Sequence, residues 1–409
     1  MGLDLTLYQA ELKEELRRIL DYWSQYTVDK KNGGFIGRLD NDNNIGEVAP
    51  KGVVLNARIL WAFSAAVSSG AGNDSYLQLA GRAYSYLKNF FIDREYGGVY
   101  WMVDPKGRPC DTRKQIYAIA FVIYGLSEFY KVSTREEVRE LAVQLYKELV
   151  RFSFDEEKGG YFEAFARDWS SVDDLRLSAK DANEKKTMNT HLHVLEAYTN
   201  LFRIWPDNGL KHQILFLLNN FSQYIIDKDT HHLVLFLDEN WKRKSSTVSY
   251  GHDIEAAWLL LEAAEVVGDF GQVATMRQNA LKMAAAAEEG LDTDGGMWYE
   301  YEPGTDHLVR QKHWWVQAEA MIGFFNAWQI DKNPVFLQAS LNSWNFIKNN
   351  ILDRVHGEWF WGVNGDGTVM KGEDKVGPWK CPYHNSRACL ELMYRIDQIK
   401  DAGNPLSIG

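Results

Sequence analysis

The sequence is poor in cysteine and proline and has no cluster of basic residues. Its three cysteines, Cys110, Cys381 and Cys389, lack metal-ligand spacing and fit a reducing compartment better than a disulfide framework. Only 9 prolines and 32 glycines occur in 409 residues, which excludes a collagenous or low-complexity chain. With 45 Lys and Arg against 56 Asp and Glu, the net charge is −11, and no basic stretch would neutralise a run of phosphates. We expect a cytoplasmic protein that binds neither nucleic acid nor a membrane.

The remaining composition is that of a well-packed globular protein. Hydrophobic residues make up 45% of the chain and charged residues 25%. The first twenty residues alternate charge with leucine at helical spacing and lack the apolar core of about 7 to 15 residues that a signal peptide has. We expect this segment to be the first helix.

A short motif recurs six times along the chain. Each copy, called here an Asp cassette, has an aspartate followed four or five residues later by a glycine or histidine and then by an aromatic or β-branched run. The copies begin at Asp29, Asp93, Asp155, Asp227, Asp292 and Asp353, and their glycine or histidine positions are Gly34, Gly98, Gly160, His232, Gly296 and Gly357. These positions are 64, 62, 72, 64 and 61 residues apart. A period near 65 residues indicates a repeat architecture.

Each repeat is expected to contain two helices and a short hairpin. The turn glycines and period-two apolar segments of the cassettes predict hairpins, and helical periodicity fills the chain between them. Six segments are apolar on all faces and belong inside, namely 55–67, 116–129, 193–205, 254–267, 318–328 and 388–396. Amphipathic partners such as 141–152 and 273–288 belong outside. The pattern predicts an all-α (α/α)6 toroid with six inner and six outer helices, short β-hairpins between them, and one domain over residues 1–409.

One position near the start of the inner segments holds histidine in three repeats. The sequences are HVLEA at 193–197, HDIEA at 252–256 and HNSRA at 384–388, so we align His193, His252 and His384 in one structural position. In a closed ring, equivalent positions meet around a central cavity. Imidazoles near their ordinary pKa of about 6.5 can take and return a proton, and two on opposite sides of one carbon can invert it.

Two charged residues complete this predicted site. Glu255 follows His252 at i+3 and lies on the same helix face, where it can orient the imidazole. Arg58 can stabilise the oxyanion that forms when a carbon acid next to a carbonyl loses its proton. A metal site is disfavoured, because His191 and His193 point about 200° apart on a helix and neither HExxH nor CxxC occurs.

Aromatic side chains are abundant, with 15 tryptophans and 20 tyrosines. Several lie at the same end of the helices as the histidines, namely Trp314, Trp315, Trp379 and Tyr383. Flat aromatic faces suit the C–H faces of a sugar, which makes a carbohydrate the favoured ligand.

Seven motifs between residues 8 and 398 resemble those of the cellobiose 2-epimerases, which belong with the N-acylglucosamine 2-epimerases to one (α/α)6 superfamily. The motifs are NARILWAF (56–63), DTRKQIYAIAF (111–121), LSAKDA (177–182), MNTHLHVLEAY (188–198), GHDIEAAWLLLEA (251–263), HWWVQAEA (313–320) and WKCPYHNSRACLE (379–391). The resemblance implies a cofactor-independent epimerisation at C2 of the reducing-end glucose of a β-1,4-linked disaccharide. Cellobiose would become 4-O-β-D-glucosyl-D-mannose and lactose would become epilactose, through ring opening and a cis-enediolate.

The same resemblance implies a role for each site residue. His252 and His384 would be the acid and base at C2, His193 would assist them, and Glu255 would support His252. The substrate-binding residues would be Arg58, Tyr117, Asn189, Trp315, Trp379, Glu319 and Asp181. The protein would be a monomer or a weak homodimer with a disaccharide as its only partner.

Three alternatives remain open at this point. Another member of the superfamily, such as an N-acylglucosamine or mannose 2-epimerase or an aldose-ketose isomerase, would use the same site. An inverting glycoside hydrolase would need two carboxylates about 6.5 to 9.5 Å apart, for which Asp111, Asp181, Asp253 and Glu319 are candidates. A non-catalytic helical repeat would bind a partner and would have no use for convergent histidines.

Overall fold

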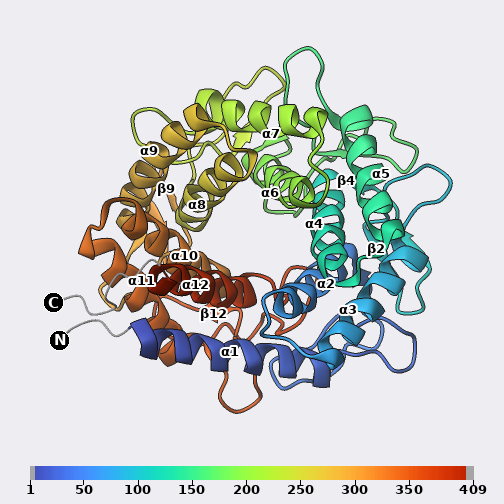
Figure 1. Cartoon of the computed structure of the whole chain (residues 1–409), viewed down its shortest axis with the longest axis horizontal. Coiled ribbons are helices and arrows are strands. Elements are labelled where there is room, and N and C mark those ends of the chain that lie inside the picture. The colour runs from blue at the N-terminus through green and yellow to red at the C-terminus, as the bar shows by residue number, and fades with distance from the viewer. Residues whose placement is uncertain (1–4, 402–409) are drawn as a thin grey trace.

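The computed structural model describes residues 5–401, which form two concentric rings of helices (Figure 1). The outer ring contains α1 (Leu5–Tyr26), α3 (Asp74–Tyr86), α5 (Glu136–Ser153), α7 (Asn208–Asn220), α9 (Phe270–Ala287) and α11 (Pro334–Phe346). The inner ring contains α2 (Val53–Ser68), α4 (Ile116–Ser133), α6 (Met188–Ile204), α8 (Tyr250–Val267), α10 (Trp314–Asp331) and α12 (His384–Asp401). This arrangement confirms the predicted (α/α)6 toroid.

Hydrophobic patterning explains which helix lies in which ring. In α2 every residue from Val53 to Ala66 is buried, whereas α5 buries only a stripe that includes Val138, Ala142, Leu145 and Leu149. An all-round apolar helix must have protein on every side, and a striped helix can face water. Among the described residues, α4 alone is long and apolar enough to cross a membrane, but 78% of it is buried, and it packs between α2 and α6 as a core helix.

The Asp cassettes form tight loops between each outer helix and the following inner helix. In each loop the cassette aspartate donates its backbone N–H to the residue five positions later, or four in the fifth repeat. In five repeats its carboxylate also binds a buried lysine, in the pairs Lys51–Asp29, Lys114–Asp93, Lys186–Asp155, Lys312–Asp292 and Lys375–Asp353, with N···O distances of 2.5 to 2.9 Å. The sixth loop closes on Glu358, so Glu358 and not Gly357 occupies the position of Gly34 and Gly98.

The short strands do more than form hairpins within a repeat. Hairpins are present as single bridges that close the cassettes, such as Val28 with Phe35, and as the pairs β2–β3 (Met102–Val103, Pro109–Asp111) and β9–β10 (Glu300–Glu302, His307–Val309). The other pairs join consecutive repeats: β1 (Lys51–Gly52) with β2, β4 (Lys114–Gln115) with β5 (Ala164–Phe165), β6 (Lys186–Thr187) with β7 (Phe236–Leu237), β8 (Val248–Ser249) with β9, and β11 (Lys312–His313) with β12 (Gly362–Val363).

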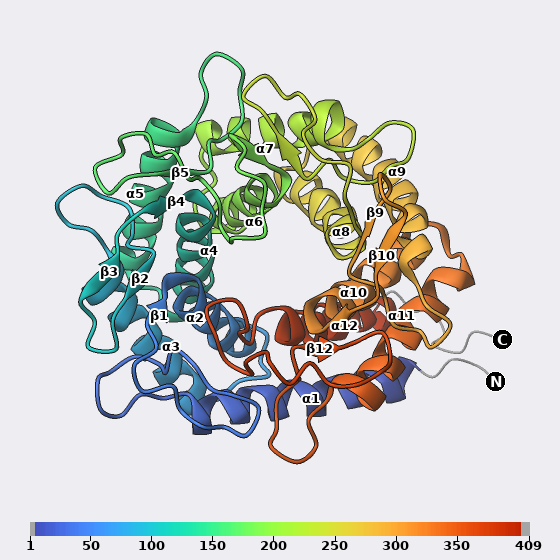
Figure 2. The same ribbon diagram turned by 180° about the vertical axis from the view of Figure 1, so that it is seen from behind.

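The first and last repeats close the ring. Leu39 bridges to Val376, which continues the inter-repeat pairing around the circle. The helices α12 and α1 lie against each other, as both views show (Figures 1 and 2), and α12 also contacts α2. Closure removes the exposed ends that an open helical solenoid would have.

Candidate active site

A cavity of about 600 Å³ opens at the ends of the inner helices where those helices begin. Ten of the eleven predicted site residues line it, from all six inner helices and two loops: Arg58, Tyr117, Asp181, Asn189, His193, His252, Glu255, Trp315, Trp379 and His384. Glu319 is fully buried behind the wall, in contact with His384. The three histidines therefore converge on one cavity, as the closed ring predicts.

The three histidines do not share one structural position, however. One inner-helix residue in each of the third, fourth and fifth repeats makes the same contact and is therefore structurally equivalent. It accepts a backbone N–H from the residue that directly follows the glycine or histidine of the Asp cassette. The pairs are Tyr161 with His191, Leu233 with Asp253, and Met297 with Gln317. In α6, His193 lies two residues after His191. In α8, Glu255 lies two residues after Asp253, whereas His252 lies one residue before it. The alignment of His193 with His252 is therefore wrong by one helical turn. An inner helix that is apolar all round offers no polar face from which to choose the register.

His193 is held by a carboxylate of its own helix. Its Nδ1–H donates to Glu196 Oε2 at 2.8 Å, and its ring lies 5.0 Å from that of Tyr117. Burial lowers the pKa of His193, so the ring is neutral at pH 7 and its Nε2 is free to accept a proton. Burial opposes ionisation of Glu196, but Arg387 and His193 outweigh it and lower the pKa of Glu196 to about 2.

His384 has the same kind of partner on a different helix. Its Nδ1–H donates to Glu319 Oε1 at 2.7 Å, and burial together with nearby Arg58 holds its pKa well below the ordinary value. A carboxylate behind Nδ1 fixes the ring tautomer, leaves Nε2 as the acceptor and stabilises the imidazolium that forms when Nε2 takes a proton. The sequence resemblance gave Glu319 a place among the substrate-binding residues, whereas it lies behind His384.

His252 differs from the other two histidines because it has no carboxylate partner in the described part of the chain. Its Nδ1 lies 2.8 Å from Ser249 Oγ, and its ring packs 4.8 Å from that of Trp315. Burial lowers the pKa of His252 to about 3. The prediction that Glu255 orients His252 is wrong: Glu255 accepts a hydrogen bond from Arg387 and approaches His384 to 4.0 Å. The i+3 contact forms between His193 and Glu196, which have the same spacing in sequence.

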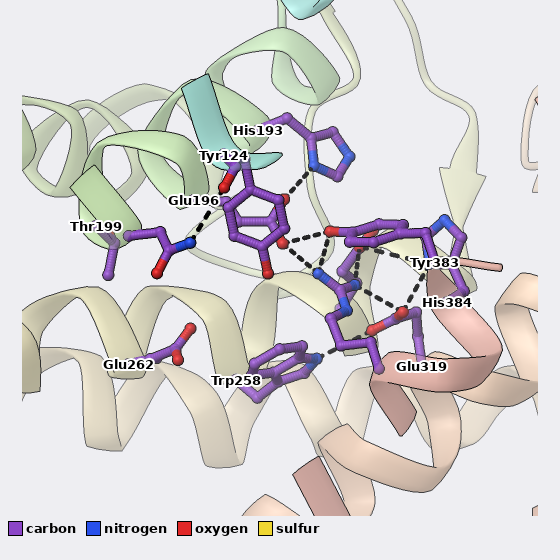
Figure 3. Close-up of polar contacts among 12 residues, drawn as sticks. Tyr124, His193, Glu196, Thr199, Trp258, Glu262, Glu319, Tyr383 and His384 are labelled. Atoms are coloured by element: carbon purple, nitrogen blue, oxygen red, sulfur yellow. Dashed lines mark hydrogen bonds and ion pairs between the residues drawn. The ribbon is translucent and has the colours of Figure 1, made fainter. Parts of the chain in front are cut away.

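Arg387 links the carboxylates beneath the cavity, among them Glu196 and Glu319, which Figure 3 shows near Tyr383. Its Nη2 donates to Glu255 Oε1 at 2.6 Å and to Glu319 Oε1 at 2.7 Å, and its Nη1 donates to Glu196 and Tyr383. One guanidinium thus faces three buried carboxylates. Sequence reasoning gave Glu196 and Arg387 no role, although the motifs it aligned contain both at i+3 from a histidine, and it considered Tyr383 only as an aromatic face for a sugar.

Two of the carboxylates that bind Arg387, those of Glu255 and Glu319, differ in how readily they ionise. Burial and the neighbouring Glu319 raise the pKa of Glu255 to about 8, and burial also raises the pKa of Glu319. Glu319 accepts from three donors, His384, Arg387 and Trp258, whereas Glu255 accepts only from Arg387. Because hydrogen-bond donors favour the ionised form, Glu319 ionises more readily than Glu255.

Arg58 is a buried cation on the cavity wall. Its Nη2 donates to Tyr117 Oη at 2.7 Å, and the guanidinium lies over the rings of Phe121 at 4.1 Å and Tyr383 at 4.6 Å. Within residues 5–401 no carboxylate lies within ion-pair distance of Arg58. Its charge is available to a negative oxygen of a bound molecule.

Polar and aromatic groups surround the mouth of the cavity. Asn189 Oδ1 is buried without a hydrogen-bond partner among the described residues, and Trp379 packs against Tyr117 with ring centroids 5.9 Å apart. Asp181 lies in the loop before α6 and accepts the backbone N–H of Ser178 at 2.8 Å. Glu163, which sequence reasoning missed, also lines the cavity, and burial raises its pKa to about 8.

The chemistry of this donor set suits a proton-transfer site better than a metal or a hydrolase site. The ligating atoms of Glu255, Glu319 and His384 lie within 4.8 Å of one another, but Arg387 Nη2 already donates to both carboxylates. Two of the carboxylates considered for an inverting hydrolase, Asp253 and Glu319, are completely buried and do not line the cavity.

Comparison with known proteins agrees with this geometry. The family model of N-acylglucosamine 2-epimerase matches residues 11–388. A cellobiose 2-epimerase of Bacteroides fragilis is 50% identical over 391 residues, which cover 96% of this chain and 100% of that protein. The solved structure of a cellobiose 2-epimerase from Bacillus thermoamylovorans superposes with a TM-score of 0.90 at 41% identity, covering 95% of this chain and 100% of that one. The N-acylglucosamine 2-epimerase of Mus musculus is 22% identical over 96% of this chain and 92% of its own length.

The chain therefore belongs to the N-acylglucosamine 2-epimerase family and is an epimerase, an enzyme of the isomerase class. Within the family its sequence is much more similar to the cellobiose 2-epimerase of Bacteroides fragilis than to the N-acylglucosamine 2-epimerase of Mus musculus.

Proposed function

We propose that this enzyme is a cellobiose 2-epimerase, which inverts C2 of the reducing-end glucose of β-1,4-linked disaccharides. Cellobiose gives 4-O-β-D-glucosyl-D-mannose, and lactose gives epilactose. The observation that carries the proposal is the convergence of three histidines and Arg58 on one cavity, in a chain that is 50% identical to a protein named cellobiose 2-epimerase.

The reaction begins with ring opening, because the proton on C2 becomes acidic only next to a free aldehyde. A histidine Nε2 then removes the C2 proton, and the electron pair moves into a cis-enediolate whose negative charge lies on O1. Arg58, which has no carboxylate partner, stabilises this oxygen together with its hydrogen-bond partner Tyr117. The enediolate is planar at C2, so a proton delivered by a second histidine from the side opposite the first inverts that carbon.

The partners of the histidines support a division of roles. His384 is backed by Glu319 through Nδ1, so the imidazolium that it forms on taking the C2 proton is stabilised. His252 lies beside only Ser249 Oγ, so its imidazolium is the less stable and the more readily gives its proton back. In the glucose-to-mannose direction neutral His384 takes the C2 proton. His252 takes up a proton from solvent and delivers it to the opposite face of C2, and His384 then releases its proton to solvent, so both rings are neutral again. The reverse reaction exchanges the roles. His193 with Glu196 serves ring opening.

The remaining residues bind the disaccharide. Asn189 offers to a sugar hydroxyl a carbonyl oxygen that has no partner among residues 5–401, and Glu255, whose pKa is raised to about 8, offers a hydrogen-bond donor when it is protonated. Trp315 and Trp379 provide flat faces for the two sugar rings. The cavity of about 600 Å³ lies within the usual range of small-molecule sites, about 300 to 1,000 Å³.

We also propose that the enzyme works in the cytoplasm as a monomer or weak homodimer. Its three cysteines are free thiols, and two of them, Cys381 and Cys389, are buried in the core. No cofactor takes part in this mechanism, since each step is a proton transfer between the substrate and a side chain.

Turnover of cellobiose in D2O tests the proposal. We expect deuterium at C2 of 4-O-β-D-glucosyl-D-mannose by NMR, and no conversion of N-acetylglucosamine or mannose under the same conditions. A small yield of the ketose is also expected, because protonation of the same enediolate at C1 gives that product. Absence of any change in cellobiose would disprove the proposal, and release of free glucose would point to hydrolysis.

A further inference from the structure

Two of the six Asp cassettes carry an ionisable side chain where the others have glycine. The residue whose carbonyl closes the loop is Gly34, Gly98, Gly160 and Gly296 in four repeats, and it is His232 and Glu358 in the fourth and sixth repeats. Both side chains are buried, at 8% and 6% exposure. Neither lines the cavity.

The four glycines have no room for a side chain. A Cβ at Gly34 would lie 2.5 Å from the ring of Tyr86, and one at Gly160 would lie 2.5 Å from Trp241 and 2.7 Å from His191 Nε2. In the third repeat the side chain would thus point at the inner-helix residue equivalent to Asp253. The fourth repeat has Val248 in β8 where other repeats have the cassette lysine, so the space beside His232 holds no lysine side chain.

The side chain of His232 binds the inner helix next to His252. Its Nδ1–H donates to Asp253 Oδ2 at 2.7 Å, while Asp253 Oδ1 accepts the backbone N–H of Leu233 at 2.8 Å. Asp253 is completely buried and directly follows His252. The first turn of α8 is therefore tied to the cassette by two bonds to one carboxylate.

Glu358 makes the corresponding contact in the sixth repeat. Its Oε1 accepts from Asn385 Nδ2 at 2.7 Å and from Lys380 Nζ at 2.8 Å, and its Oε2 accepts from Trp23 Nε1 at 2.7 Å. Asn385 directly follows His384. The link again reaches the residue next to a histidine of the cavity wall.

These links coincide with the two histidines assigned to C2. In the third and fifth repeats the equivalent residues, His191 and Gln317, bind only backbone groups, and Thr190 and Val316 stand where His252 stands in α8.

We infer that His232 and Glu358 are positioning residues, which hold the first turns of α8 and α12 so that the imidazoles of His252 and His384 keep their places on either side of C2. This inference rests on the proposed epimerase function. Small displacements of a reacting group are costly, about 100-fold in rate for 1 Å.

The test compares two variants that each cut one such link. His232→Gly restores the residue of the other cassettes and removes the bond to Asp253. Gln317→Leu cuts the equivalent link in the fifth repeat, where Val316 stands in the position of His252. Thermal unfolding identifies a temperature at which both variants are folded, and kcat and KM on cellobiose are measured there. We expect His232→Gly to lower kcat about tenfold with KM within twofold, and Gln317→Leu to leave kcat within twofold.

Two further variants make the result specific. His232→Asn keeps a donor near the position of Nδ1 and should restore most of kcat. His232→Leu keeps the volume without the bond, so it should be as slow as His232→Gly, and it replaces that variant if the glycine protein does not fold. His231→Asn, one residue away, is a control for the loop and should behave as wild type.

The outcomes separate this inference from the proposed function. If wild type does not epimerise cellobiose, the proposed function fails first. If wild type is active and His232→Gly and His232→Leu keep its kcat, or if Gln317→Leu is equally slow, the inference is wrong, because the link would then be a general support of the fold.

Discussion

Replacing Glu319 by glutamine tests the mechanism at a point that the substrate does not touch. Glu319 Oε1 accepts the Nδ1–H of His384 at 2.7 Å, and the residue does not line the cavity. Glutamine keeps the size and one acceptor oxygen but removes the negative charge. The imidazolium of His384, formed as the C2 proton is taken, then lacks its counter-charge.

The size of the effect follows from the kind of bond that is lost. Hydrogen bonds to charged groups contribute about 1.5 to 3 kcal/mol, and each 1.4 kcal/mol changes a rate about tenfold. We expect Glu319→Gln to lower kcat roughly 10- to 150-fold, with KM for cellobiose changed by less than about threefold, because the lost interaction strengthens only in the transition state.

The assay is the rate of deuterium incorporation at C2 in D2O, measured beside circular dichroism and thermal unfolding. The control is Glu128→Gln on α4, an isosteric change of another buried carboxylate, which binds Ser68, Lys131 and Asn200 away from the cavity. That variant should lose stability and keep kcat. If folded Glu319→Gln exchanges the C2 proton at the wild-type rate, Glu319 does not stabilise His384 and the assignment of the base is wrong.

Three further predictions concern the oxyanion, the cassettes and pH. Arg58→Met should lower kcat on cellobiose about 100- to 1,000-fold, as loss of one oxyanion donor does, and a near-normal kcat would remove Arg58 from this role. Lys186→Met leaves Asp155 with an uncompensated buried charge and should cost about 3 to 5 kcal/mol of unfolding free energy in urea titration; a loss below about 1 kcal/mol would contradict the buried pairing. Burial lowers the pKa values of His252 and His313 to about 3, so the unfolded chain binds more protons below its ordinary histidine pKa of about 6.5. The stability contributed by the neutral state of these histidines should therefore be lost as pH drops from about 6.5 towards 4, and a His313→Gln protein whose unfolding midpoint has the same pH dependence as wild type would refute the buried neutral state.

The fold was accessible from sequence because it is repeated six times. Any single cassette is a weak signal, but six at one period, separated by helices that are either apolar all round or striped, leave few other architectures. The convergence of the histidines on one cavity was accessible for the same reason, since a closed ring brings the starts of its inner helices to one end, whereas the resemblance to the cellobiose 2-epimerases supplied most of the substrate-binding residues.

The sequence did not show which side chains one helical turn apart are in contact. The spacing i, i+3 occurs in His193–Glu196, His252–Glu255 and His384–Arg387, and sequence reasoning chose the second pair, which does not form. The register of each helix depends on how the ring closes around Arg387.

The amino-acid sequence by itself determined the number of repeats, the inner and outer helices and the set of side chains available for proton transfer, because periodicity and polarity are local properties of the chain. Only the tertiary structure decided which carboxylate supports which histidine. His384 and Glu319 are 65 residues apart in sequence and 2.7 Å apart in space, and burial beside Glu319 raises the pKa of Glu255 to about 8, well above that of an isolated glutamate. Such pairings follow from ring closure and from the low dielectric of the core, and neither is a property of any one segment.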